Sequence, residues 1–123
     1  IRMFLLRVIR RGNDMKKFIN MQGYTDTTPY EVIKVISDKT LEIRSMTVEK
    51  NPDFKPDFIP GGFSAHCTNN YDQKWLISSN PQGHTFRVRK RKTQKNYGEG
   101  VYWHQTAHYK LADKPHYFYD YNF

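Results

Sequence analysis

The chain has 123 residues, a formal net charge of +8 at pH 7, and 15% aromatic residues in an otherwise hydrophilic composition. No apolar run approaches the roughly 20 residues that span a bilayer, which argues against a membrane partner. A single cysteine, Cys67, cannot form an internal disulfide and suits a reducing compartment such as the cytoplasm. The length suits one domain, and the abundance of aromatic residues over leucine and alanine favours β structure over a helical bundle.

The first fourteen residues differ in character from the rest. Their apolar stretch is broken by Arg7 and no small-residue cleavage site follows, so a secretory signal is not expected. Codons for Arg10, Arg11 and Gly12 can spell a purine-rich ribosome-binding sequence shortly before Met15. We therefore expect residues 1–14 to be an over-extended reading frame or a disordered segment, and residues 15–123 to form one small β-rich domain.

A short apolar element at residues 18–21 and a turn-rich stretch at 23–29 precede the first predicted hairpin. Residues 30–36 and 40–48 are rich in Val, Ile and Thr and are joined by Ser37-Asp38-Lys39, which is typical of two paired strands. Residues 51–62 contain three prolines, which remove backbone donors and predict a loop. Because aromatic and aliphatic side chains are embedded in this loop, we expect it to pack on the sheet.

A second hairpin is predicted from residues 74–79 and 84–90 around the turn at residues 80–83, which has proline at its first central position and glycine at its close. Residues 101–104 predict another short strand, and one helical turn is expected near Tyr109. The fold class is therefore mainly β: a small antiparallel sheet, or a partly closed barrel, of five or six strands with at most a short helix.

The segment from residue 84 to 95 is the most basic part of the chain, with six cationic side chains and no acidic one. Phe86 and Val88 alternate with Arg87 and Arg89, which in a strand places the apolar pair on one face and the arginines on the other. The consecutive cations at residues 89–92 cannot all share one face, so we expect them to spread into the following loop.

A concentrated positive stripe attracts phosphate-bearing ligands, and small barrels bind single strands by combining cations with aromatic stacking. The alternative reading is a solvated edge strand whose charges prevent pairing with other molecules. The sequence predicts binding of single-stranded nucleic acid or a nucleotide, with a host protein bound through the aromatic loop and C-terminal edge as the alternative partner. The candidate nucleic-acid-binding residues are Arg87, Arg89, Lys90, Arg91, Lys92, Lys95, Trp75 and His84.

Histidines and the cysteine raise the question of a metal site or catalysis. His104 and His108 have a spacing that would suit two ligands on one helical face, but Gln105 stands where a zinc protease has its glutamate. No Cys-x-x-Cys pair is present. His66 and Cys67 are neighbours and should point to opposite faces of an extended chain.

We therefore expect His66, Cys67 and Asn69 to organise a turn through local hydrogen bonds and burial of the thiol. The sequence predicts no catalytic residue, no metal and no cofactor. It predicts a binding protein rather than an enzyme.

Three segments carry a resemblance to known sequences: GYTDTTPYEVI at 23–33 with SDKTLEI at 37–43; PGGFSAHCTN at 60–69 with DQKW at 72–75; and DKP at 113–115 with YDYNF at 119–123. Together they resemble a family of small bacteriophage and prophage proteins of unknown activity. The resemblance implies a phage setting, hence the cytoplasm of an infected or lysogenic host, and transfers no catalytic residue. Residues 94–109 depart from the shorter form expected in that family.

Overall fold

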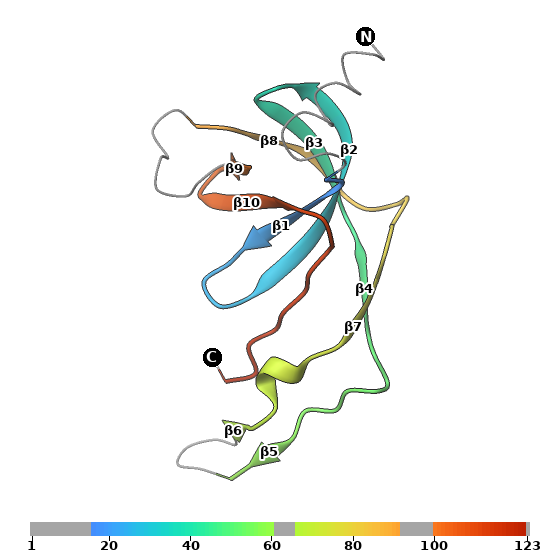
Figure 1. Cartoon of the computed structure of the whole chain (residues 1–123), viewed down its shortest axis with the longest axis vertical. Coiled ribbons are helices and arrows are strands. Elements are labelled where there is room, and N and C mark those ends of the chain that lie inside the picture. Colours follow the sequence, from blue (N-terminus) through green and yellow to red (C-terminus); the bar gives the residue numbers. More distant parts are fainter. Residues whose placement is uncertain (1–15, 61–65, 92–99, 123) are drawn as a thin grey trace.

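The computed structural model describes residues 16–60, 66–91 and 100–122, and Figure 1 shows its arrangement. Six strands close into an antiparallel barrel in the order β1-β10-β9-β8-β3-β2. Neighbours in the barrel are also successive among these six strands along the chain, so the barrel is an up-and-down meander. Their bounds are β1 (Phe18–Gln22), β2 (Thr27–Ser37), β3 (Thr40–Ser45), β8 (Thr85–Arg89), β9 (Val101–His104) and β10 (Ala107–Ala112). The predicted mainly β fold and small barrel are confirmed.

Alternation of apolar and polar residues explains why these strands close around a core. In β3, Leu41 and Ile43 are buried, while Glu42 between them faces outward. Ile19 of β1 and Val88 of β8 are fully buried against them. The remaining members of the core cluster are Val35, Tyr102 and Tyr109.

Between β3 and β8 the chain leaves the barrel and returns. β4 (Thr47–Lys50) and β7 (Trp75–Ser78) pair as a separate two-stranded sheet, which we call the arm. Beyond it, β5 (Phe58–Ile59) pairs with β6 (His66–Cys67), and a 3-10 helix, η1 (Asn70–Asp72), follows. We call residues 51–60 and 66–74, together with the C-terminal tail 113–122, the tip. Figure 1 shows the arm descending from the barrel and the tail running back to η1.

The predicted second hairpin is wrong in its pairing, although its turn is present. The Gly83 N–H donates to the Asn80 carbonyl at 2.9 Å, yet β7 pairs with β4 while β8 pairs with β3. A Cβ on Gly83 would lie 2.4 Å from the Ser45 carbonyl oxygen, so the turn packs directly on the end of β3. Because the turn is held there, β7 before it and β8 after it belong to different sheets.

The other local predictions meet mixed outcomes. The hairpin of residues 30–36 with 40–48 is confirmed, with its second run divided between β3 and β4. The helical turn near Tyr109 is wrong, because Tyr109 is a buried residue of β10. In the part of the chain that the structure describes, the only helical turn is η1.

The proline-rich stretch is not entirely irregular, since β5 forms between Pro56 and Pro60. The predicted packing of this loop on the sheet is wrong for Phe58 and Ile59, which are 47% and 48% exposed, and the Phe58 ring contacts Tyr121 of the tail. Residues 1–14, predicted to be over-extended or disordered, lie outside the described residues. Across the described ranges, no helix is long and apolar enough to cross a membrane.

Candidate nucleic-acid interface

The two faces of β8 are as the alternation predicts. Val88 is fully buried and Phe86 packs against the core, whereas Arg87 and Arg89 are exposed on the outer side of the barrel. The register places Arg89 beside Thr40 on one neighbouring strand and beside Trp103 on the other. Both guanidinium groups therefore project from a strand that pairs with β3 on one side and with β9 on the other.

Lys90 and Arg91, the two described cations after β8, contact different side chains of β9. The Arg91 guanidinium lies over the Trp103 indole, 4.6 Å from its centroid, and donates to the main-chain oxygen of Gln105. Lys90 Nζ lies 5.5 Å from the ring centroid of Tyr102, a core residue. Lys90 and Arg91 therefore lie against different rings of β9, as expected of cations that do not share one face; the rest of that prediction concerns Lys92 and the residues after it, outside the described residues. We call Arg87, Arg89 and Arg91 the outer basic face.

Acidic side chains neutralise only some of the arginines on and around the outer basic face. Arg87 Nε lies 3.9 Å from Glu42 Oε1, and Arg44 pairs with Glu31 at 3.0 Å. Within the described residues Arg89 and Arg91 have no ion-pair partner. Because exposed ion pairs contribute about 0 to 1 kcal/mol, even Arg87 can exchange its carboxylate for a phosphate at little cost.

Three aromatic rings lie together at one end of the barrel, where β8 begins and β9 ends. The His84 and Phe86 ring centroids are 5.5 Å apart with planes inclined by 26°, and Phe86 is 4.7 Å from His104. Toward the core, Phe86 meets the edges of Tyr30 at 5.4 Å and Tyr109 at 5.8 Å. We call His84, Phe86 and His104 the rim rings.

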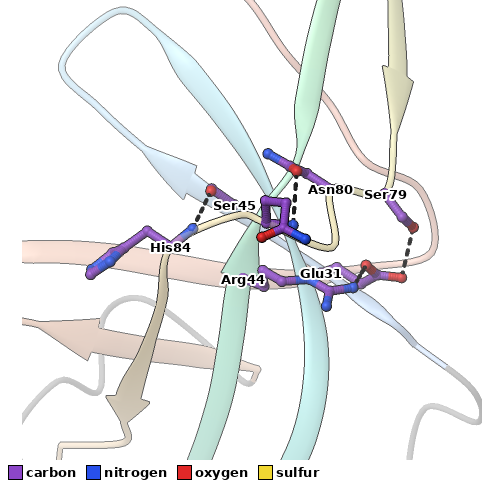
Figure 2. A network of polar contacts seen from close by, with 7 residues as sticks. Glu31, Arg44, Ser45, Ser79, Asn80 and His84 are labelled. Atoms are coloured by element: carbon purple, nitrogen blue, oxygen red, sulfur yellow. Dashed lines mark hydrogen bonds and ion pairs between the residues drawn. The ribbon is translucent and has the colours of Figure 1, made fainter.

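A polar network fixes the chain where the arm returns to the barrel, as Figure 2 shows. The Glu31 carboxylate accepts from Arg44 at 3.0 Å through one oxygen and from the Ser79 hydroxyl at 3.0 Å through the other. The His84 N–H donates to the Ser45 hydroxyl oxygen at 3.0 Å. These contacts anchor the start of β8 on β3 and so position the His84 ring.

Burial changes the acid–base behaviour of three tyrosines of the barrel. Desolvation raises the pKa of Tyr109 to about 12, with a further contribution from Tyr30. Desolvation also raises the pKa of Tyr30, and the pKa of Tyr102 is raised by desolvation and then by the Asp38 carboxylate. These phenols therefore remain neutral near pH 7.

Not all of the predicted site residues lie together. Trp75 is in the arm, where its Nε1–H donates to Gln73 Oε1 at 2.8 Å and its ring meets Tyr117 edge-on at 4.7 Å. It belongs to a different sheet from the β8 cations. Lys92 and Lys95 lie outside the described residues.

His104 is the ring that sequence reasoning missed, because it was weighed only as a metal ligand with His108. The two lie on the paired strands β9 and β10 and face opposite ways: His104 contacts Phe86, whereas His108 lies 5.3 Å from Trp103. Alternation along residues 101–104 would have placed His104 on the face of Tyr102. In the ranges that the structure describes, no three His, Cys, Asp or Glu side chains gather as a metal site.

The Cys67 region organises a turn, as the sequence predicted. Cys67 is 1% exposed while His66 is exposed, and the thiol lies 3.3 Å from Asn69 Oδ1. The Asn69 amide also accepts from the Asp57 N–H at 2.8 Å and donates to the Lys55 carbonyl at 2.9 Å. The asparagine thus ties β6 to the chain before β5.

Charge is unevenly distributed between the two ends of the molecule. The barrel segments 16–46, 84–91 and 100–112 carry ten Lys or Arg against four Asp or Glu, whereas the tip carries three Lys against five Asp.

No protein-family model, curated protein or solved structure matches the chain. The geometry and charge of this interface are therefore the basis for a functional conclusion.

Proposed function

We propose that the protein binds a phosphate-bearing partner, single-stranded nucleic acid or a nucleotide, through the outer basic face. The observation that carries this is that the exposed guanidinium groups of Arg89 and Arg91 have no acidic partner among the described residues and lie on a strongly basic barrel. Arginine presents several N–H donors in a planar fork that matches phosphate oxygens. Phosphate contacts of this kind supply affinity without base specificity.

Binding without catalysis is the activity that we propose. Each phosphate neutralised by the protein releases condensed counterions, so affinity falls as salt rises. On the resemblance of three segments to phage proteins, we place this activity in the cytoplasm of an infected or lysogenic bacterial host.

The test is binding of labelled oligothymidine, duplex DNA and a nucleotide across a salt series, measured by fluorescence anisotropy. The triple variant Arg87→Gln, Arg89→Gln and Arg91→Gln should lose most of the affinity. If the three side chains each contact one phosphate of a single strand, the slope of log affinity against log salt should fall by about 2.

A charge-matched control lies at the other end of the molecule. Lys55, Lys74 and Lys114 are exposed, and their change to Gln removes the same net charge from the tip. This control should bind nearly as the wild type does. Equal losses in the two triple variants would mean that only total charge matters, and the outer basic face would then not be the site.

Docking of a host protein on the tip is a second candidate function. Four of the large apolar side chains that remain exposed belong to the tip: Phe58, Ile59, Tyr71 and Tyr119. Exposed aromatic groups held on an ordered scaffold are typical of protein interfaces. In nuclease-treated host extract, a discrete partner should be retained by the wild type and lost by Phe58→Ser with Ile59→Ser, but kept by the arginine triple variant.

A further inference from the structure

We infer that the rim rings His84, Phe86 and His104 form a base-stacking platform for single-stranded nucleic acid. This assignment rests on the function proposed above and narrows its partner from phosphate-bearing ligands in general to an unpaired strand. It gives His104 a role that its spacing to His108 does not suggest.

The rings are in contact with one another: His84 and Phe86 are stacked, and His104 is inclined by 50° to Phe86. Centroid separations of 5.5 Å between His84 and Phe86 and 4.7 Å between Phe86 and His104 are contact distances for aromatic groups. The planes of His84 and Phe86 differ by only 26°, so a base lying on His84 would continue an existing stack. Stacking of this type accepts any base, because every base has a π-face.

The surface is accessible and ordered before a ligand arrives. His84 is exposed, and Phe86 and His104 are half-buried. Behind them Tyr30 and Tyr109 hold the Phe86 ring by edge contacts. The His84 backbone is held by Ser45, and Figure 2 shows its ring pointing away from the polar network around Glu31. An ordered platform loses little conformational freedom on binding.

The outer basic face extends toward the end of the barrel that carries the rings. Arg91 donates to the main-chain oxygen of Gln105, the residue directly after His104. Arg87 follows His84 by three residues, which is about 10 Å along a strand. Phosphates can therefore lie on the outer basic face while a base turns over the barrel end onto His84. The bases of a duplex are already stacked and paired, so an unpaired strand is the nucleic acid that fits.

The experiment compares oligothymidine with an abasic strand of the same length, which has the same phosphates but no bases. The wild type should prefer oligothymidine by at least about fivefold, since one stacked base is worth about 5- to 150-fold in affinity. His84→Ala with His104→Ala should remove this preference and leave the salt dependence unchanged. His84→Tyr, which keeps a ring, should retain it.

The matched control is His66→Ala with His116→Ala, two exposed histidines of the tip, which should preserve the preference. Melting curves check that the variants fold, and the exposed His84→Ala alone serves if the double variant does not. Equal wild-type affinity for the two strands, tighter binding of a duplex, or an undiminished preference in the His84 variants would overturn the platform while leaving phosphate binding intact. A wild type that binds neither strand at low salt would overturn the proposed function as well.

Discussion

The barrel and the tip are held together by different forces. The barrel buries a cluster of aliphatic and aromatic side chains from all six of its strands, whereas the buried residues of the tip are Cys67 and Asn70. In place of a core, the tip has side-chain hydrogen bonds between segments far apart in the chain, such as Asn70 to Asp120 at 3.1 Å. Apolar burial scales with area, while each hydrogen bond adds only about 1 kcal/mol, so the tip should open at a lower free energy than the barrel.

The charge of the two regions differs in the same way. The barrel is strongly basic and exposes guanidinium groups, while the tip is slightly acidic and exposes aromatic rings. One chain thus presents two chemically distinct surfaces at opposite ends of the arm. Partner chemistry and local stability can therefore be tested separately in the two regions.

The largest effect should come from the barrel core. Ile43→Ala removes a fully buried side chain and should lower the free energy of unfolding by about 2 to 5 kcal/mol in urea titrations. The matched change at the tip, Ile59→Ala, affects a side chain that is 48% exposed and should cost under about 0.5 kcal/mol. Similar losses in the two variants would contradict the difference between the regions.

Alkaline pH should weaken the barrel next. An unfolded tyrosine ionises near pH 10, but burial raises the pKa of Tyr109 in the folded chain to about 12. The folded state therefore binds more protons in this range. The contribution of Tyr109 to the free energy of unfolding is fully present below pH 10. It falls by up to about 2.7 kcal/mol as the pH rises through 12.

The measurement for this prediction is a series of denaturant melts between pH 9 and 12. Tyr109→Phe should have a visibly shallower pH dependence than the wild type. An identical slope in the variant would show that other groups govern the alkaline transition.

The tip should loosen by itself when its link to the tail is removed. The Asn122 amide accepts from the Cys67 N–H at 2.7 Å and donates to the Cys67 carbonyl at 3.0 Å. Asn122→Ala should cost about 1 to 3 kcal/mol locally, and the buried thiol should then react faster with a disulfide reagent. Asn51→Ala, which removes one exposed turn contact to Asp53, should change the thiol rate little.

The decisive comparison is with the barrel melting transition of the same Asn122 variant. The melting temperature of the barrel should shift by only a few degrees in this variant. A loss of barrel structure in step with thiol exposure would mean that the two regions unfold as one unit.

The smallest effect should come from the β9–β10 turn. Gln105 has a φ of 56°, a left-handed conformation that glycine adopts more readily. Gln105→Gly should raise stability by at most about 1 kcal/mol, because glycine also increases the entropy of the unfolded chain. Gly100→Ala, at a φ of 74°, should lower the melting temperature; a gain there would contradict the strain argument.

Local patterns in the sequence account for much of the barrel. The two-residue alternation of Phe86 and Val88 with Arg87 and Arg89 predicts both faces of β8, because side-chain direction in a strand depends only on parity. The proline and glycine at residues 80–83 predict their turn for a similar reason, since turn geometry depends on backbone preferences of adjacent residues. Polar alternation likewise predicts that Cys67 is buried and His66 exposed.

The tertiary structure alone decides which strands pair and which side chains meet. β7 could have paired with β8 across a good turn, but the close packing of Gly83 on Ser45 sends it to β4 instead. The rim rings come from His84 and Phe86 at the start of β8 and from His104 at the end of β9, far apart in the sequence, and Asn122 meets Cys67 across 55 positions. Sequence patterns determined the faces of each strand because those are local properties. The contacts within the interface and the tip join residues far apart in the chain. Barrel closure and long-range burial select those contacts, and no local pattern specifies them.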